Sequence, residues 1–442
     1  MSLISLWSRL LAAVLAVLLS SCGGGSSATP PVGGLTVIPG GGQAVVTWKA
    51  DPGVTYWLAY APTAGAVDMK NPPAGNIWLT PVTSPVTVTG LLNGTTYGFA
   101  VDARVNGGPG GAQTPTVNVT PRASGNSTSS WTVQTELGTD LLGLSYGTNA
   151  STVLNYLAVG TGGTMYSGVD VIDTTYGDAS YGLDSVTWTA LSGTPTANFK
   201  ASLYALGQFF AVGTNDTNGV NIYHSTDLVT WTPAATPVAG GLNALTTNGT
   251  VVMGVGNNGV IQYSTDGITW LSANSTPTPA TMPNLYGVAY SPNGLWVAVG
   301  SGGTIWVSGD GLNWASQASN AGTNNLYGVA SSPTGLLVAV GQGGTVVSSL
   351  DGASTTPWVV NTLAPSNGAD LYAVNADGWQ FLAVGAGGSV FSAVNPASVT
   401  NGVWSASWTG TSTGTARNLY AMYGSSARYT VVGQAGANII GQ

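Results

Sequence analysis

Charged residues are scarce in this chain of 442 residues. Lys and Arg together number 8 and Asp and Glu 16, so charged residues make up 5% of the sequence and the formal net charge is −8. Soluble proteins typically carry about 25%. The shortage of cations argues against nucleic acid as a partner, because such binding needs many Lys and Arg contacts to phosphate. The surface must therefore be hydrated through uncharged polar side chains and backbone groups, as in many secreted and cell-surface β-proteins.

Cysteine and histidine each occur once, as Cys22 and His224. A single cysteine excludes an intramolecular disulfide. Without a second His or a Cys near it, His224 completes neither a zinc site nor a Ser-His relay. His224 is therefore predicted to be a packed or exposed histidine of a strand.

The N-terminus has the features of an export signal. Arg9 supplies its positive charge, an apolar run follows over Leu10–Leu19, and the run is shorter than the roughly 20 residues that span a bilayer. Leu19-Ser20-Ser21-Cys22 resembles the lipobox of bacterial lipoprotein precursors. An ordinary signal peptide with a leftover cysteine is the alternative.

The lipobox resemblance implies a signal peptide over residues 1–21 and acylation of Cys22. It also implies a lipid-anchored location in the bacterial cell envelope, and Gly23 after the cysteine implies the outer membrane or cell surface. Residues 22–34 are rich in Gly, Ser and Pro and are predicted to be a flexible tether.

Residues 35–122 carry strand-like segments separated by Pro and Gly turns, such as Ala44–Trp48 and Thr55–Tyr60. The stretch Leu91–Val101, with Tyr97 at its centre, resembles the tyrosine corner of a fibronectin type III domain, and Trp48 takes the place of its core tryptophan. The resemblance implies a β-sandwich that spaces or presents another domain.

A Val-Gly pair followed by a Gly-rich turn recurs at intervals of 41 to 53 residues through the rest of the chain. This interval is the length of one four-stranded blade, so residues 123–442 are predicted to form a β-propeller. Each pair is expected to end the second strand of a blade, and turns such as Asn258-Gly259 to start the third. The pairs begin at Val159, Val212, Val255, Val299, Val340, Val384 and Val432.

A second repeated motif follows the third strand. Ser264-Thr265-Asp266-Gly267, with Trp270, is the clearest copy, and these repeats resemble the Asp boxes of sialidase-type propellers. A carboxylate and hydroxyl at this spacing bind turn backbone groups, so we assign the motif to structure. In the sixth repeat Asn395 replaces Asp, and either Trp404 or Trp408 closes the strand. The assigned aspartates are Asp227, Asp266, Asp310 and Asp351.

The seventh repeat lacks its last strand. Only residues 437–442 follow the third turn, whereas Trp131-Thr132 before the first repeat matches Trp188-Thr189 and Trp231-Thr232. The predicted fold is therefore all-β, with a seven-bladed propeller closed by its N-terminal strand, so that no sheet edge is left open.

Catalysis finds little support in the residues. Sialidases clamp a carboxylate with three arginines, and the propeller region holds only Arg417 and Arg428, after Arg104 and Arg122 in the preceding domain or at its exit. A two-carboxylate glycosidase needs a spaced pair of acids, but Glu136 is the only Glu in the propeller. A glycan-active enzyme other than a sialidase remains the alternative to a non-catalytic binding module.

Four carboxylates gather in an insertion of the first blade, and no cofactor other than calcium is suggested by the sequence. Hard oxygen ligands at short spacing can bind Ca²⁺, but the spacing fits no EF-hand, so an acidic solvated loop is the preferred interpretation. The residues are Asp170, Asp173, Asp178 and Asp184.

Ligand binding is expected on the face where the last strand of one blade leads to the first strand of the next. Glu136 and Arg417 fall near this face, and an ion pair between them is the preferred interpretation. Asp140 and Asp370 occupy the place of Asn284 and its equivalents, where a repeated Asx predicts a structural cap. A repeated tyrosine of the innermost strand is a candidate for lining a ligand funnel, but packing is the preferred interpretation, because every blade packs alike. These tyrosines are Tyr286, Tyr327, Tyr372 and Tyr420.

The sequence thus predicts a surface-anchored lipoprotein whose propeller binds a protein or polysaccharide partner. Its repeats also resemble those of photosystem assembly factors of the Ycf48 type, which implies protein binding without catalysis.

Overall fold

The computed structural model describes residue 31 and residues 35–441, with gaps at 41–42, 49, 52, 64, 85, 93–94, 106–109, 120, 122–130, 152, 173–182, 236–239, 275, 280, 354–355, 365–367, 377–379, 395–403, 405 and 425–428. The signal peptide, Cys22 and nearly all of the tether lie outside the described residues, as do Arg122, Arg428 and Asn395. Within the described part, no helix is long and apolar enough to cross a membrane.

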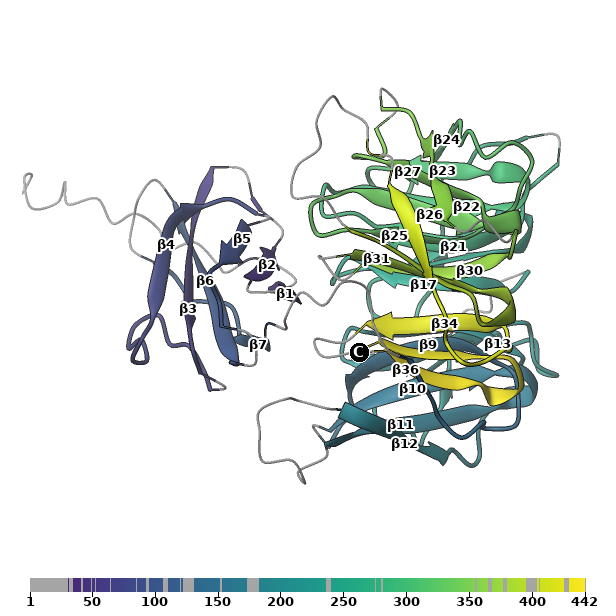
Figure 1. The fold of residues 1–442 in the computed structure, drawn as a ribbon, viewed down its shortest axis with the longest axis horizontal. Helices are drawn as coiled ribbons and strands as arrows, with labels where there is room; N and C mark the ends of the chain where they lie inside the picture. Colours follow the sequence, from purple (N-terminus) through teal and green to yellow (C-terminus); the bar gives the residue numbers. More distant parts are fainter. Residues whose placement is uncertain are drawn as a thin grey trace, which may run out of the picture. The chain divides into compact units, whose positions relative to one another are not determined.

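Residues 36–119 form two β-sheets (Figure 1), with strand orders β1-β2-β5 and β4-β3-β6-β7. In the four-stranded sheet, Leu58 pairs with Val101 and Tyr60 with Phe99, and all four side chains are buried on one face. Trp48 is also buried, as predicted for a core residue, and its ring meets Tyr56 edge-on at 5.4 Å. The strands are β1 (Thr36–Gly40), β2 (Gln43–Thr47), β3 (Val54–Ala61), β4 (Ile77–Val82), β5 (Val86–Thr89), β6 (Tyr97–Val105) and β7 (Val117–Val119).

The segment between β3 and β4 folds back over the other face of the four-stranded sheet. Val67 is fully buried there against Ala59, Ala61 and Ala100, whose small side chains make room for it. Gln113 accepts a hydrogen bond from the Met69 backbone N–H at 2.6 Å and so holds the segment down. This covering segment could not be read from the strand pattern, and it forms one wall of a pocket described below.

Residues 131–441 form a succession of sheets (Figure 1), each built from strands that are neighbours in sequence, with two exceptions noted below. The first four sheets are β9 (Leu141–Thr148) to β12 (Leu183–Ala190), β13 (Phe199–Ala205) to β16 (Thr232–Pro233), β17 (Leu242–Thr247) to β20 (Leu271–Ser272), and β21 (Leu285–Tyr290) to β24 (Ala315–Gln317). Their inner strands are β10 (Leu154–Gly160), β11 (Met165–Ile172), β14 (Gln208–Gly213), β15 (Ile222–Ser225), β18 (Val252–Gly256), β19 (Ile261–Ser264), β22 (Trp296–Gly300) and β23 (Ile305–Ser308).

The remaining sheets have the orders β25-β26-β27-β28, β29-β33-β32-β31-β30 and β34-β35-β36-β8. Their strands are β25 (Leu326–Ser331), β26 (Leu337–Gly341), β27 (Val346–Ser349), β28 (Val359–Val360), β29 (Thr362–Ala364), β30 (Leu371–Ala376), β31 (Gln380–Gly385), β32 (Val390–Val394), β33 (Ser407–Thr411), β34 (Leu419–Gly424), β35 (Tyr429–Gly433), β36 (Asn438–Gly441) and β8 (Trp131–Val133).

The sheets close into a ring. The strand at one edge of each sheet lies against the corresponding strand of the next, in the order β9, β13, β17, β21, β25, β30 and β34. Strand β34 in turn lies against β9, so these edge strands surround a common centre. Apolar side chains such as Trp306, Phe381 and Trp408 fill the spaces between neighbouring sheets.

The repeated Val-Gly pairs end the second strand of their sheets, as the sequence predicts. The glycine is not required for its φ, which is extended, at −170° for Gly341. It is required because an added Cβ would overlap the carbonyl oxygen of Asn325, the residue before the first strand of the same sheet. That oxygen accepts a hydrogen bond from the Gln342 N–H at 2.8 Å, which fixes the close approach. The same overlap recurs at Gly160, Gly213, Gly256, Gly300, Gly385 and Gly433.

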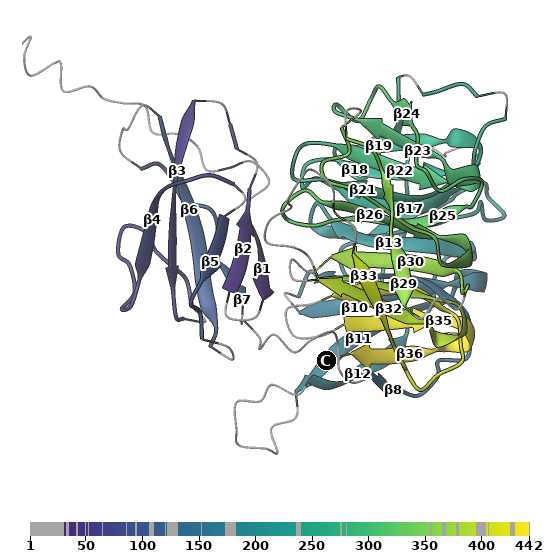
Figure 2. The same ribbon diagram turned by 45° about the horizontal axis from the view of Figure 1, so that its top comes forward.

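Strand β8 supplies the outer strand of the last sheet (Figure 2). Thr132 pairs with Ile440 and Trp131 with Gly441, although about 300 residues separate them in the chain. The Gln134 N–H extends the pairing by donating to the Asn438 carbonyl at 2.8 Å. Both ends of this part of the chain are thereby held in one sheet.

The sheet β29-β33-β32-β31-β30 has an additional strand. After β28 the chain continues into β29, which pairs in parallel with β33, Leu363 lying opposite Trp408. The pairing of Ser392 with Thr409 places Trp408 one step further, opposite Ala393. Trp408 therefore takes the repeat position of the Asp-box tryptophans. Trp404 packs beside it on Phe381.

Candidate functional site

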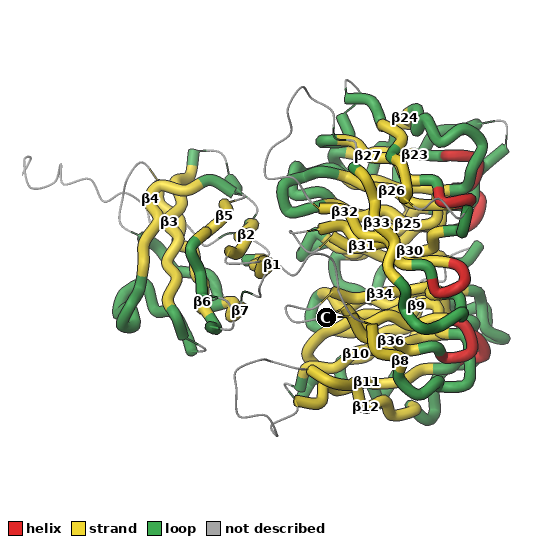
Figure 3. The backbone as a smooth tube through the Cα atoms, viewed as in Figure 1, coloured by secondary structure: helices red, strands yellow, loops and turns green. Residues whose placement is uncertain are grey.

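The two ends of the strands in residues 131–441 carry different turns. Six short 3-10 turns, η1 to η6, join the second and third strands of their sheets and gather on one face (red in Figure 3). The Asp-box turns follow the third strand, which begins at the 3-10 turns and runs to the opposite face. We call the face that carries the 3-10 turns the channel face, and the face that carries the Asp-box turns the Asp-box face. The 3-10 turns are η1 (Thr161–Gly163), η2 (Asn257–Gly259), η3 (Ser301–Gly303), η4 (Gln342–Gly344), η5 (Ala386–Gly388) and η6 (Gln434–Gly436).

Each 3-10 turn is capped by an Asx side chain that precedes the first strand of the next sheet. Asn325 accepts a hydrogen bond from the Gly302 N–H at 3.0 Å, and Asp370 accepts one from the Gly343 N–H at 2.8 Å. Asn284, Asn418 and Asp140 do the same for their turns, which is the capping role predicted for the repeated Asx. The repeats in the sequence did not single out Asn198, which accepts a hydrogen bond from the Gly162 N–H at 2.7 Å.

The Asp-box carboxylates are occupied by backbone hydrogen bonds. Asp266 accepts from the N–H groups of Ile268 and Thr269, both at 2.8 Å, and these bonds lower its pKa to about 2. Asp310 and Asp227 are held in the same way, with lowered pKa values, while Asp351 accepts from the Ala353 N–H. In the Asp227 turn Leu228 takes the positive φ, 63°, that glycine provides in the others.

Asp-box turns also connect successive sheets. The Ala235 N–H donates to the Ile268 carbonyl at 2.9 Å, and the Asn274 N–H donates to the Leu312 carbonyl at 2.9 Å. Gln317 Nε2 donates to the Gly352 carbonyl at 2.7 Å. The Asp-box face is therefore committed to holding the ring together.

Replacing Ser308 by alanine is expected to lower the free energy of unfolding by about 1–3 kcal/mol, the cost of leaving a buried donor unpaired. Ser308 is buried, and its Oγ accepts from the Gly311 N–H at 2.8 Å while donating to Asp310 at 2.9 Å. Denaturant unfolding measures the change, with the exposed Ser316→Ala as control, for which a shift within about 0.5 kcal/mol is expected. Equal stability of the two variants would contradict the structural role of the motif.

A ring of seven side chains lies at the channel face, where each first strand has a bulge. In β21 the pairing jumps from Leu285 to Gly287 and leaves Tyr286 unpaired, and the equivalent jump leaves out Tyr327, Tyr372 and Tyr420. The same register shift leaves out Leu142, Lys200 and Asn243 in the first three sheets. All seven are half-buried, and we call them the bulge ring.

The four tyrosines form a continuous aromatic ladder within the bulge ring. Ring centroids are 5.6 Å apart for Tyr286 and Tyr327, 5.7 Å for Tyr327 and Tyr372, and 5.3 Å for Tyr372 and Tyr420. Burial raises the pKa of the Tyr372 hydroxyl, and Asp370 and the neighbouring tyrosines raise it further. The ladder therefore presents hydroxyl groups and partly accessible ring surfaces.

Small residues behind the bulges bring the first strands close together. A Cβ at Gly328 would lie 3.2 Å from the Cα of Ala373 and from the Tyr372 carbonyl oxygen, both in the next sheet. At Gly287 it would lie 3.0 Å from the Tyr327 carbonyl oxygen. The resulting narrow ring explains why tyrosines of adjacent sheets touch.

Lys200 supplies the charge in the bulge ring. Its Nζ donates to Asn243 Oδ1 at 2.8 Å, and Asn243 Nδ2 donates to Asn257 Oδ1 and the Leu285 carbonyl. Burial lowers the pKa of Lys200. Reasoning from the tyrosine repeat missed this residue, because Leu, Lys and Asn break the pattern in the first three sheets.

Glu136 and Arg417 form the predicted ion pair. Nε and Nη2 of Arg417 donate to the two carboxylate oxygens at 2.8 and 3.1 Å, which lowers the pKa of Glu136 and raises that of Arg417. Both side chains remain more than 40% exposed, so the pair contributes little to stability. It connects the segments that lead into β9 and β34 on the channel face.

A groove of about 910 Å3 opens at η3 on the channel face. Its walls are residues 277–279, 281–283, 316–320 and 322, and η3 and Trp306 also line it. Asn284 and Asn325, whose side chains cap η2 and η3, each lie two residues before a ladder tyrosine. The groove and the ladder thus both lie on the channel face.

The calcium candidates are mostly placed on strands or not described. Asp170 lies in β11, opposite Val186, and Asp184 lies in β12, so part of the predicted loop is a strand pair. Asp173 and Asp178 lie outside the described residues.

His224 is a half-buried residue of β15, and burial lowers its pKa. Among the side chains described, no three of His, Cys, Asp or Glu are grouped to hold a metal ion.

Comparison with known proteins identifies the fold. No family model matches the chain, and no curated protein matches it. YCF48 bound to D1 peptide shares 15% identity and a TM-score of 0.52, covering 70% of this chain and 94% of that one. YCF48 from Cyanidioschyzon merolae gives 15% and 0.52, with 71% and 98% covered, and virginiamycin B lyase from Staphylococcus aureus gives 11% and 0.53, with 71% and 99% covered. The chain is therefore an all-β protein with a β-propeller.

Proposed function

We propose that this protein is a lipid-anchored envelope protein whose propeller binds an extended segment of a partner protein without catalysis. The observation that carries the proposal is the four-tyrosine ladder at the channel face, the same face that holds a groove of about 910 Å3. Tyrosine offers a rigid, amphipathic contact surface, and it is enriched where proteins meet.

The commitment of the Asp-box face to structure supports the choice of the channel face. Its carboxylates already bind the backbone of their own turns, and several of its carbonyls accept hydrogen bonds that link successive sheets. The channel face, by contrast, carries connections of differing length, such as those from β20 to β21 and from β24 to β25. Variable segments on a rigid scaffold are where binding usually occurs.

The proposal also includes the number of blades, the closure of the ring and the type of the N-terminal domain. The sheets that follow one another through residues 131–441 are the blades of a seven-bladed propeller, and β8 closes the ring by pairing with β36. Residues 35–122 are a fibronectin type III-like sandwich that spaces the propeller from the anchor. The buried Trp48 and Tyr97 support this interpretation.

The structural neighbours support a binding role at the level of the fold. One of them, YCF48, was solved with a bound D1 peptide, so a propeller of this shape can hold a peptide. Virginiamycin B lyase has the same fold and is an enzyme by name, so the fold alone does not decide between binding and catalysis. The ladder and the groove, which offer contact surface without a pair of spaced acids, favour binding.

Tyr327→Ala is expected to weaken partner binding about tenfold or more, as truncation of a central interface tyrosine does. Arg417→Ala is expected to weaken it less, because the Glu136 pair lies exposed beside the ladder. Affinity capture from envelope extracts, quantified by mass spectrometry, checks both, with Ile268→Ala on the Asp-box face as control. Loss of capture only in the control variant would contradict the proposed surface. Turnover of a glycan by the purified chain, abolished by one carboxylate substitution, would favour the glycan-active alternative.

Cys22→Ala is expected to release the protein from membranes, because one acylated cysteine is the proposed anchor. Membrane fractionation of wild-type and variant cells measures this directly. Equal retention of both proteins in the membrane fraction would contradict anchoring through an acylated Cys22.

A further inference from the structure

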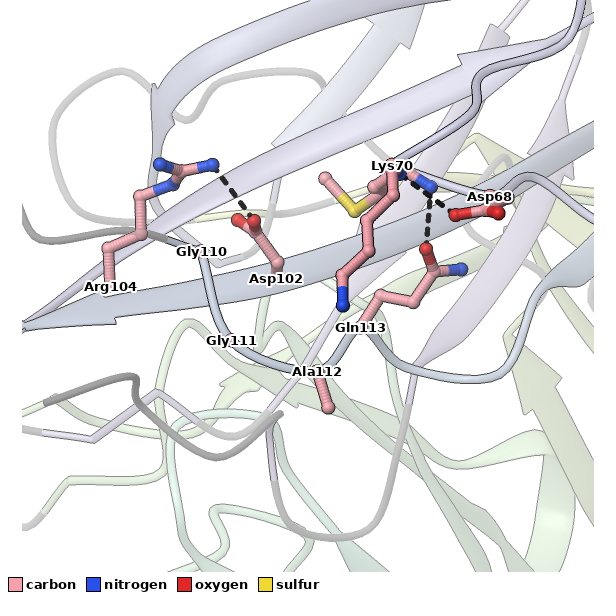
Figure 4. A pocket seen from close by; sticks show the side chains of 9 residues that line it. Asp68, Lys70, Asp102, Arg104, Gly110, Gly111, Ala112 and Gln113 are labelled. Carbon is pink, nitrogen blue, oxygen red and sulfur yellow. Dashed lines mark hydrogen bonds and ion pairs between the residues drawn. The ribbon is translucent and has the colours of Figure 1, made fainter.

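A pocket of about 470 Å3 lies in the N-terminal part of the chain. Asp102 and Arg104 of β6 form one side, and Asp68 to Lys70 of the segment after β3 form another (Figure 4). Gly110 to Gln113 complete the lining. Gln113 fixes the pocket's shape, because its amide binds the backbone of Val67 and Met69.

Asp102 is the unusual member of this pocket. Its side chain is buried, the residue being 4% exposed, yet only Oδ2 is bonded, to Arg104 Nη2 at 3.0 Å. Oδ1 is buried and has no hydrogen-bond partner among the residues that the structure describes. Burial raises the pKa of Asp102, and Arg104 offsets part of this shift. A buried polar oxygen left unpaired is costly, and it indicates a missing donor.

The arginine cannot turn to satisfy this oxygen. Its guanidinium carbon lies 3.4 Å from the ring centroid of Trp57, a stacked cation–π contact that fixes its plane. Figure 4 shows the Asp102 carboxylate between Arg104 and Lys70, with the Lys70 side chain extending along the pocket. Lys70 is exposed. Asp102 and Lys70 both line the pocket, which therefore offers an acceptor and a donor.

We infer that this pocket binds a neutral saccharide, whose hydroxyls donate to Asp102 Oδ1 and accept from Lys70 Nζ. The four charged residues of the pocket, Asp68, Asp102, Lys70 and Arg104, sum to zero formal charge, so the site selects neither cations nor anions. An ammonium ligand would meet Lys70, and a carboxylate ligand would meet Asp102. A hydroxyl is both donor and acceptor and suits the two groups at once.

Two tryptophans on the same face of the sheet extend the site. Trp57 pairs directly with Asp102, and Trp78 pairs with Ala59, two residues along β3, so both indoles project from the face that carries the carboxylate. Their rings are 6.2 Å apart and nearly perpendicular, and Trp78 is 37% exposed. An exposed indole beside hydrogen-bonding groups provides an apolar surface for the C–H face of a sugar.

The test is titration of the full chain with cellohexaose, chitohexaose, maltohexaose and xylohexaose, followed by tryptophan fluorescence and calorimetry. At least one of these is expected to bind, and Asp102→Asn and Lys70→Ala are each expected to weaken it about tenfold or more, the loss for one hydrogen bond to a charged group. Lys70 is exposed, so its variant keeps the fold even if Asp102→Asn does not. Asp51→Asn, which removes an exposed charge from the turn before β3, should leave binding unchanged.

Several outcomes would overturn the inference. One is the absence of binding by all four saccharides up to about 10 mM. Another is binding of N-acetyl-lysine methylamide that Lys70→Ala strengthens and Asp102→Asn abolishes, which would assign an ammonium ligand. A third is saccharide binding that Tyr327→Ala removes and both pocket variants leave intact, which would place the saccharide on the propeller. The inference is independent of the proposed protein binding, since partner capture through Tyr327 can fail while this pocket still binds.

Discussion

Replacing Gly341 by alanine is expected to lower the free energy of unfolding by about 3 kcal/mol or more, the upper range for overpacking a rigid core. The new Cβ would overlap the carbonyl oxygen of Asn325, which the Gln342 N–H holds by a hydrogen bond. Backbone atoms cannot rotate away as a side chain does, so β25 and β26 would have to separate. Denaturant or thermal unfolding of the purified chain measures the effect.

Gly309→Ala is the matched control. Gly309 lies in the neighbouring repeat, and a Cβ added there has no neighbour within 4 Å. Its replacement is expected to change stability by no more than about 0.5 kcal/mol. If the two alanine variants have the same free energy of unfolding, the close approach of strand and carbonyl does not explain the repeated glycine.

Deleting residues 126–135 is expected to abolish cooperative unfolding of the propeller, losing most of the about 5–15 kcal/mol that stabilises a domain. The deletion removes β8 and leaves the edge of β36 unpaired. It also removes Trp131, which packs against the buried cluster that contains Leu382, Leu419 and Tyr429. An exposed edge strand pairs with other chains, so the variant should aggregate. Calorimetry and size-exclusion chromatography report both effects.

The control deletion removes residues 123–129 and keeps Trp131 to Val133. It should melt as the wild-type chain does, because the strand pairing with β36 is retained. A full deletion variant that stays monomeric with an unchanged melting profile would show that β8 does not close the ring.

The repeated elements of the fold could be predicted because each has a local physical cause. The Val-Gly pairs mark strand ends wherever a backbone carbonyl approaches the glycine, and Ser264 and Asp266 mark turns because their side chains bind the turn backbone. The start of β21 at Leu285 likewise follows from the capping residue before it. Such features depend on neighbours in sequence, so their spacing reveals them.

Features that depend on distant residues could not be predicted. The parallel pairing of β29 with β33 depends on where the chain runs after β28, which no repeat specifies. Lys200 joins the tyrosines only through the position of its bulge, since its type breaks the repeat. The pocket at Asp102 brings together Lys70 and Gly110 from separate segments. None of these residues carries a motif of its own.

The most direct test of the account is photo-crosslinking from single positions on the two faces of the propeller. A p-benzoylphenylalanine at position 327, within the tyrosine ladder, is expected to crosslink a protein partner in envelope extracts. The same group at position 268, an exposed residue of an Asp-box turn, is expected to give no such product. A partner captured from position 268 and not from position 327 would contradict the assignment of the channel face as the binding surface.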